Sequence, residues 1–192
     1  MKKRVLVIVA HPDDETIWMG GLLLKNKDNW KTTIICLCRM DDKDRAPKFK
    51  KVCEILRAKS YMSDLEDEKL TDISINEVLE RIKKFVKRRR YDYIFTHGNN
   101  GEYGHKRHID VNGAVKELLK NKFLTARRIF SFSYIKKKSS CNPNQKADKF
   151  IYLSNLILNK KKSLIQNIYG FKKDSFEEKS CGNIESFDVI KI

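Results

Sequence analysis

The fold of this chain follows from one stretch near its start, Val5-Leu6-Val7-Ile8-Val9-Ala10-His11-Pro12-Asp13-Asp14-Glu15. The first five residues form an apolar run that predicts a strand buried on both faces of a sheet. One imidazole and three carboxylates follow within the next six residues, and an apolar helical pattern begins directly after them. Because such a charged cluster has few structural uses, we expect the rest of the fold to be arranged around it.

Short apolar runs alternate with helical periodicity along the rest of the chain. Strands are predicted over residues 4–10, 32–38, 60–63, 91–96, 128–134 and 149–153, with an edge segment near 187–190. Helices are predicted over residues 15–26, 47–59, 78–86, 111–119 and 155–169, and polar loops over 97–108 and 136–146. This alternation predicts a single α/β domain over residues 1–192, a Rossmann-like three-layer fold with a mostly parallel sheet and helices on both faces.

Composition is that of a globular protein with an unusual charge. The chain has 192 residues, of which 41% are hydrophobic and 10% aromatic, and its formal net charge is +16. A surplus of this size raises the question of an anionic partner, but the lysines are spread through the whole chain, which indicates a general compositional bias. Five cysteines without a CxxC pair indicate reduced thiols and a cytoplasmic location. No apolar run reaches membrane-spanning length.

All four histidines fall at predicted strand ends or in the loops that follow them. His11 comes after the first strand, and His97, His105 and His108 come with three glycines after the strand at 91–96. Ligands of parallel α/β sheets bind outside the carboxyl ends of the strands, where such loops converge. We therefore expect a functional site between these two loops, with no catalytic role for His97.

The residues of the two loops suit a catalytic zinc site. Such a site takes three ligands from His, Asp or Glu and leaves one position to water. His11 and Asp14, with His108 or His105, supply that set without thiolates. Each loop alone has a plainer explanation, namely acidic residues that cap a helix start and polar residues in a first helical turn. Both loops together favour a metal site.

The two loops also carry a family resemblance. Residues 10–15 read Ala-His-Pro-Asp-Asp-Glu, and residues 101–108 read Gly-Glu-Tyr-Gly-His-Lys-Arg-His. The pair resembles the two motifs of the PIG-L family, also called LmbE-like, of zinc-dependent N-deacetylases. The order of strands and helices resembles that family over roughly residues 3–135, and the remainder agrees only loosely.

The resemblance implies a division of roles within the site. His11, Asp14 and His108 would hold Zn²⁺, with another divalent ion such as Fe²⁺ as an alternative in the cell. Asp13 would be the general base that takes a proton from the attacking water. His105 would polarise the amide carbonyl or its oxyanion and, as imidazolium, protonate the departing amine.

Further residues match family positions less firmly. Tyr103 occupies the position of a residue that assists the oxyanion, with a packed loop tyrosine as the alternative. Arg45 follows the second strand, where the family often places an arginine that contacts substrate, and an exposed arginine is the alternative. Glu15 is expected to support the ligands. Arg107 stands where several members carry an acidic residue, so the residue that orients His105 is open.

The function implied is a metal-dependent N-deacetylase that removes the acetyl group from an N-acetylglucosamine-type amino sugar or its conjugate. The positive net charge of the chain favours an anionic conjugate as substrate. Whether the chain forms a homo-oligomer stays open. Two other functions stay open: a metal-bound, non-catalytic sugar-binding module and a basic nucleic-acid-binding protein. The latter has support in Arg88–Arg90, Lys136–Lys138 and Lys160–Lys162, but no nucleic-acid motif accompanies them, so we expect no nucleic-acid partner.

Overall fold

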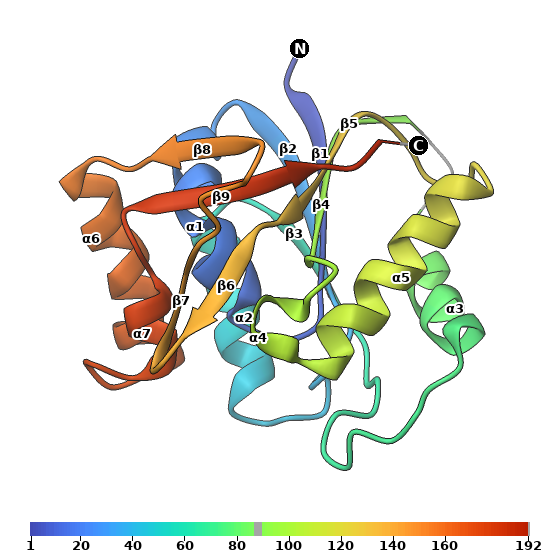
Figure 1. Cartoon of the computed structure of the whole chain (residues 1–192), viewed down its shortest axis with the longest axis horizontal. Helices are drawn as coiled ribbons and strands as arrows, with labels where there is room; N and C mark the ends of the chain where they lie inside the picture. Colours follow the sequence, from blue (N-terminus) through green and yellow to red (C-terminus); the bar gives the residue numbers. More distant parts are fainter. Residues whose placement is uncertain (87–89, 192) are drawn as a thin grey trace.

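The computed structural model describes residues 1–86 and 90–191, in which strands and helices alternate (Figure 1). In chain order the elements are β1 (Lys3–Val9), α1 (Asp14–Asn26), β2 (Trp30–Cys36), α2 (Arg45–Ile55), β3 (Lys59–Met62), α3 (Ile75–Phe85), β4 (Arg90–Thr96), α4 (Gly101–Gly104), α5 (Lys106–Lys120), β5 (Thr125–Phe132), β6 (Tyr134–Lys137), β7 (Ser140–Pro143), β8 (Lys149–Tyr152), α6 (Asn155–Ser163), the π-helix η1 (Leu164–Tyr169), α7 (Phe176–Ser180) and β9 (Ile184–Val189). Among the described helices, none is both long and apolar enough to cross a membrane.

The main sheet is mostly parallel, as predicted. Its seven strands lie in the order β3-β2-β1-β4-β5-β9-β8. The pairings from β3 to β5 are parallel, and β9 pairs antiparallel with both β5 and β8. The segment near residues 187–190 was expected at an edge, but β9 lies inside the sheet because β8 covers its outer side.

Helices cover both faces of this sheet (Figure 1). Alternate side chains of β1 point to opposite faces: Val5, Val7 and Val9 pack in a cluster with α1 and α2, whereas Leu6 and Ile8 pack with α3 and α5. All five of these side chains are fully buried. The predicted three-layer α/β architecture is therefore confirmed.

The chain reverses its direction of travel across the sheet between β1 and β4. From β1 it proceeds outward to β2 and β3, then returns to place β4 on the other side of β1. In open α/β sheets the crevice at such a reversal is the usual ligand site. The loops after β1 and β4 carry the two motifs, so the topology brings these motifs together.

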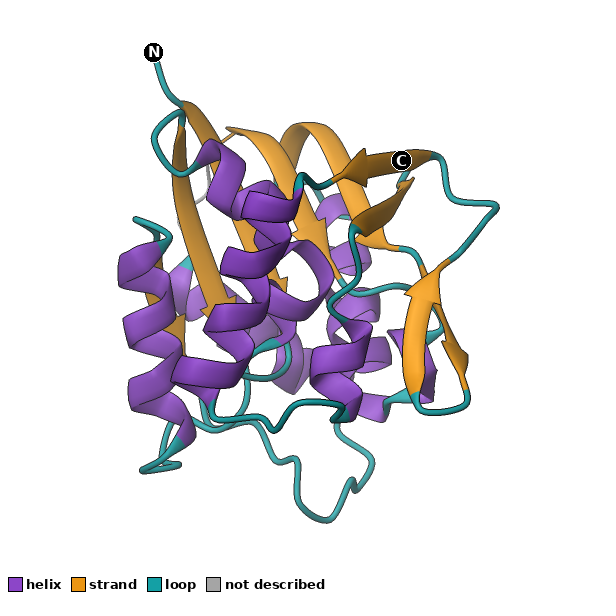
Figure 2. Cartoon of the chain, turned by 90° about the vertical axis from the view of Figure 1, so that its left-hand side faces the viewer, coloured by secondary structure: helices purple, strands orange, loops and turns teal. Residues whose placement is uncertain are grey.

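Several elements differ from the sequence prediction. Residues 134–143, mostly assigned to a loop, form the hairpin β6–β7, which stands apart from the main sheet (Figure 2). Tyr134 anchors it, because this buried side chain donates a hydrogen bond to the backbone oxygen of Trp18 at 2.8 Å. α5 begins within the predicted loop and carries His108, and α7 forms in the unassigned tail.

Other boundaries shift by a few residues. α2 begins at Arg45 and ends at Ile55, so it starts two residues before Pro47 and stops short of residue 59. The predicted helix 155–169 changes from α-helix to π-helix at Leu164. Arg88 and Arg89, part of the basic run Arg88–Arg90, lie outside the described residues, and Arg90 begins β4, one residue before the predicted strand 91–96.

Candidate active site

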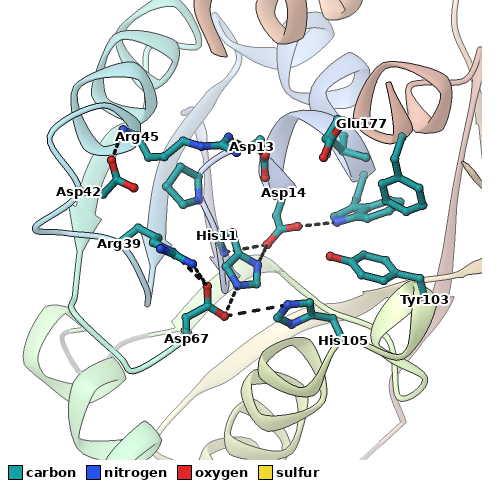
Figure 3. Close-up of a pocket in the computed structure, with 14 residues that line it drawn as sticks. His11, Asp13, Asp14, Arg39, Asp42, Arg45, Asp67, Tyr103, His105 and Glu177 are labelled. Carbon is teal, nitrogen blue, oxygen red and sulfur yellow. Dashed lines mark hydrogen bonds and ion pairs between the residues drawn. The ribbon is translucent and has the colours of Figure 1, made fainter. Parts of the chain in front are cut away.

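Two neighbouring carboxylates lie where the loop after β1 becomes α1. Asp13 has a φ of 112°, in the left-handed region, and its backbone N–H donates to the Glu15 carboxylate. Asp14 accepts the indole N–H of Trp18 on Oδ1 at 2.9 Å and the backbone N–H of His11 on Oδ2 at 2.8 Å. These bonds direct the two carboxylates differently, so Asp14 lies against His11 while Asp13 faces away from it (Figure 3).

The three predicted metal ligands meet at one point. His11 Nδ1 lies 3.1 Å from His108 Nε2 and 3.3 Å from Asp14 Oδ2, and His108 Nε2 lies 3.4 Å from the same oxygen. A tetrahedral zinc site with bonds of about 2.0–2.1 Å spaces its ligands by about 3.3–3.4 Å. Two imidazoles and one carboxylate at this spacing fit a divalent metal such as zinc.

Glu102 holds the histidines of the second motif. Its Oε2 accepts Nδ1–H of His108 at 2.5 Å and of His97 at 2.9 Å, and Oε1 accepts the Gly98 backbone N–H at 2.7 Å. Burial disfavours its charge, but His97 and His108 outweigh this and lower the pKa of Glu102 to about 2. Its carboxylate thus directs Nε2 of His108 toward Asp14, which is the usual arrangement behind a metal-binding histidine.

Other groups in the described part of the chain also have metal-binding spacing. They are His11–His105–His108, Asp14–His97–His108 and His11–Cys38–Asp67. His97 has no free nitrogen for a metal, because Nε2 accepts the Ala10 backbone N–H at 2.9 Å and Nδ1 is bonded to Glu102. Both ring nitrogens of His97 thus have a partner within the fold, and the absence of a catalytic role for it stays a prediction.

Asp13 lies beside Arg45 in the cavity wall. Burial and the neighbouring Asp14 carboxylate raise the pKa of Asp13, and Arg45 and His11 oppose this rise. Arg45 Nη1 donates to Asp13 Oδ2 at 3.1 Å, and its guanidinium lies 4.5 Å from the ring centroid of Phe171. Arg45 therefore lines the cavity. From the sequence, a simply exposed arginine was the alternative to a residue that contacts substrate.

His105 caps the start of α5. Its Nδ1 accepts the Arg107 backbone N–H at 3.3 Å, so the proton of the neutral ring lies on Nε2. Burial, together with the positive charge that His11 and His108 can carry, lowers the pKa of His105 to about 4. A ring that is neutral near pH 7 donates a hydrogen bond from Nε2 more readily than it delivers a proton.

Tyr103 is packed and also reaches the cavity. Its ring contacts those of His108 and Phe176 edge to face, at 5.3 and 5.1 Å between centroids. Burial raises the pKa of Tyr103, so its hydroxyl stays protonated and can act as a donor.

Asp67 and Arg39 also line the cavity, although we predicted no role for them from the sequence. Asp67 Oδ1 lies 2.9 Å from His11 Nε2, and Arg39 donates to Asp67 Oδ2 from Nε at 3.1 Å and from Nη2 at 2.9 Å. The acidic run Asp64–Glu68 was visible in the sequence, but nothing in it distinguished Asp67 from its neighbours.

Most of the residues described above line one cavity of about 300 Å³. They are His11, Asp13, Asp14, Arg39, Arg45, Asp67, Tyr103 and His105. Figure 3 shows Asp67 and His105 on one side of the cavity and Asp13 and Glu177 on the other. His108 is fully buried and does not line the cavity surface. Glu177, with Phe176, brings α7 to the cavity from a part of the chain in which the sequence indicated no function.

Comparison with known families gives a clear result. A sequence model of the PIG-L family, described as GlcNAc-PI de-N-acetylase, matches residues 6–119. This chain belongs to the PIG-L family. The matched segment runs from β1 almost to the end of α5 and contains both motif loops, so the family resemblance is confirmed.

One curated relative resembles part of this chain. "Uncharacterized protein L374" of Acanthamoeba polyphaga mimivirus is 26% identical over an alignment of 130 positions, and the match covers 59% of this chain and 56% of that protein. The match thus spans little more than half of the relative's length.

Solved structures share the fold at low sequence identity. An N,N'-diacetylchitobiose deacetylase from Pyrococcus horikoshii has a TM-score of 0.72 and 18% identity, covering 98% of this chain and 84% of that one. A deacetylase involved in the teicoplanin biosynthetic pathway has a TM-score of 0.62 and 13% identity, covering 87% and 82%. GalB, the 4-carboxy-2-hydroxymuconate hydratase from Pseudomonas putida, has a TM-score of 0.73 and 15% identity, covering 100% and 97%. Because a hydratase shares this fold with deacetylases, the reaction has to be argued from the site.

Proposed function

We propose that this PIG-L chain is a metal-dependent N-deacetylase that hydrolyses the N-acetyl amide of an N-acetylglucosamine-type sugar or its conjugate. The observation that carries the proposal is the triangle of 3.1–3.4 Å between His11, Asp14 and His108, with the Asp13 carboxylate beside it in an open cavity. The family description, GlcNAc-PI de-N-acetylase, and two deacetylases among the structural neighbours support the substrate class.

His11, Asp14 and His108 would hold the metal. When bound, zinc would supply a Lewis acid and lower the pKa of a water molecule to about 7. The same set of two imidazoles and one carboxylate also binds Fe²⁺. We therefore propose zinc as the metal and keep Fe²⁺ as the alternative in the cell.

Asp13 would carry the proton through the reaction. Its raised pKa suits a base that takes a proton from water as the oxygen attacks the acetyl carbon, and the resulting carboxylic acid can protonate the departing nitrogen. Amide hydrolysis needs that proton because an amide anion is a very poor leaving group. The low pKa of His105 is the reason that we assign this second step to Asp13 and not, as from the sequence, to His105.

His105 and Tyr103 would stabilise the oxyanion as hydrogen-bond donors. Both groups keep a proton near pH 7, on Nε2 of His105 and on the hydroxyl of Tyr103, and both line the cavity. Donors fixed in a partly buried site are effective because they need little reorganisation as charge develops. Arg45 would bind substrate or hold Asp13 in place. A single domain over residues 1–192, a cytoplasmic location and self-association stay predictions.

A panel of substrates tests this function. The zinc-loaded protein is incubated with N-acetylglucosamine conjugates that differ in the group attached to the sugar, and free acetate and primary amine are both measured. We expect equal amounts of acetate and amine from at least one conjugate. Protein that holds zinc and binds these sugars without releasing acetate would favour the non-catalytic binding module instead.

A further inference from the structure

Arg107 departs from the family pattern and is fully buried at the start of α5. Its guanidinium donates to Asp110 Oδ2 at 2.7 Å, to Glu66 Oε2 at 2.7 Å and to the Thr71 backbone oxygen at 2.8 Å. Its Nε also donates to the backbone oxygen of Glu66. Apart from the bond to Asp110, these contacts join α5 to the loop that connects β3 with α3.

That loop, residues 63–74, delivers Asp67 to the site. Arg39 holds Oδ2 of Asp67 from the loop after β2, and Arg107 holds the adjoining residue, Glu66, through backbone and side chain. Asp67 is thus fixed from two directions. Its other oxygen, Oδ1, lies 2.9 Å from His11 Nε2 and 4.0 Å from His105 Nε2.

The bond to Asp67 decides which nitrogen of His11 is free for a metal. A carboxylate accepts a proton-bearing nitrogen, so Asp67 favours the tautomer with hydrogen on Nε2 and a lone pair on Nδ1. Nδ1 is the nitrogen that faces Asp14 and His108. If the loop shifted, His11 would lose both its tautomer and its ring orientation.

We propose that Arg107 is a positioning residue, which anchors the 63–74 loop so that Asp67 orients His11 toward the metal. An acidic side chain at position 107 could not accept a bond from His105 Nδ1, because that nitrogen already accepts the Arg107 backbone N–H. In this chain the carboxylate partner of His11 comes from the loop, and residue 107 secures the loop. The inference rests on the metal centre of the proposed function.

The test is zinc affinity, measured by competition with a chromophoric chelator for wild type, Asp67→Asn, Arg107→Met and the double variant. Loss of an orienting carboxylate typically costs about 10–100-fold in metal affinity. We expect Asp67→Asn to fall in that range, Arg107→Met to lose at least about threefold, and the double variant to bind zinc no more weakly than Asp67→Asn alone. Affinity losses that multiply in the double variant would mean that Arg107 acts independently of Asp67, and would overturn the inference.

Arg81 provides a matched control because it anchors the start of the same loop. It donates to Ser63 Oγ at 2.9 Å, to the Asp64 carboxylate and to Glu77 on α3 at 3.0 Å, and its hydrogen bonds to described residues do not include residues 66–68. Arg81→Met should keep the zinc affinity of wild type within about twofold; a loss equal to that of Arg107→Met would reduce Arg107 to a general stabiliser of the loop.

A milder variant and the substrate assay keep the possible outcomes apart. If Arg107→Met does not fold, Glu66→Gln removes the same ion pair at its more exposed partner. This variant should also weaken zinc binding. Unchanged affinity would contradict the inference. Zinc binding that weakens as expected in a protein that releases no acetate would refute the proposed reaction only. Wild-type protein that binds no zinc would refute the metal centre and this inference together.

Discussion

Asp13, the proposed general base, lines the cavity beside the triangle of His11, Asp14 and His108 but is not part of it. Asp13→Asn keeps the size of the side chain and removes its basicity. We expect zinc content to stay at about one per chain and turnover to fall by about 10²-fold or more, the range typical of general bases. Zinc analysis and acetate release on the same sample give both numbers. Retention of most activity would show that another group takes the proton.

Glu102 contacts the proposed metal ligand His108, whose Nδ1 lies 2.5 Å from its carboxylate. Glu102→Gln weakens this bond and leaves His108 free to take the other tautomer. We expect zinc affinity to drop by about 10–100-fold with little change in secondary structure. Glu117→Gln, on α5 and outside the cavity, is the control and should bind zinc like wild type. Equal affinities for the two variants would remove Glu102 from the site.

The sequence indicated some site residues and missed others, for a physical reason. His11, Asp14 and His108 belong to two short polar motifs that follow predicted strands, so they stand out in a linear pattern. Glu102 was part of the second motif, but its pattern predicted no role for it. Asp67 was one of several acidic residues in a loop. Their roles depend on which neighbour each side chain meets across the crevice, and this is decided by tertiary contacts.

α1 is broken at Met19, whose φ and ψ are −148° and 17°. The Glu185 carboxylate on β9 accepts the backbone N–H groups of Gly21 and Leu22 at 2.7 and 2.8 Å, and so caps the second half of the helix. Lys161 neutralises it at 2.8 Å, and both charged side chains are fully buried.

Removal of Lys161 would leave the Glu185 charge buried without a partner. We expect Lys161→Met to lower the free energy of unfolding by about 3–5 kcal/mol. Lys160→Met, at the exposed neighbouring position, should stay within about 0.5 kcal/mol of wild type. Urea unfolding of the three proteins measures these differences. Lys161→Met that is as stable as Lys160→Met would show that the pair adds nothing.

Elements with strong periodicity were predictable, and elements that depend on partners were not. β1, α1 and β4 are close to their predicted ranges because burial imposes their apolar patterns. The run Lys160–Lys162 looked like a basic patch, but Lys161 pairs with Glu185 and Lys162 with Glu178. Two of its three charges are therefore neutralised within the fold, which weakens the argument for nucleic acid.

The two apolar clusters of the whole molecule do not depend on the metal site. They lie on the two faces of the sheet, whereas the candidate ligands lie in the loop after β1 and in the first turns of α1 and α5. Chelation should therefore abolish acetate release but leave the far-ultraviolet circular dichroism unchanged. The apparent stability should drop only by the binding energy, about 2.7 kcal/mol at a zinc concentration of 100 times Kd. Unfolding on chelation would make the metal structural.

The cavity does not share the basic charge of the chain. Its walls hold five carboxylates, on Asp13, Asp14, Asp42, Asp67 and Glu177. Its two guanidinium groups are already paired, Arg39 with Asp67 and Arg45 with Asp13. This balance does not support the anionic conjugate expected from the net charge. We expect kcat/KM for neutral N-acetylglucosamine conjugates to equal or exceed that for phosphorylated ones; a tenfold preference for phosphate would contradict this.

The central claim is that one metal ion, held by His11, Asp14 and His108, makes this chain an N-deacetylase. The most direct test adds zinc stepwise to metal-free protein and follows amine release from an N-acetylglucosamine conjugate. The rate should rise in proportion to added zinc and level off at one equivalent per chain. No amine release at any zinc level, or release that does not depend on zinc, would contradict the claim.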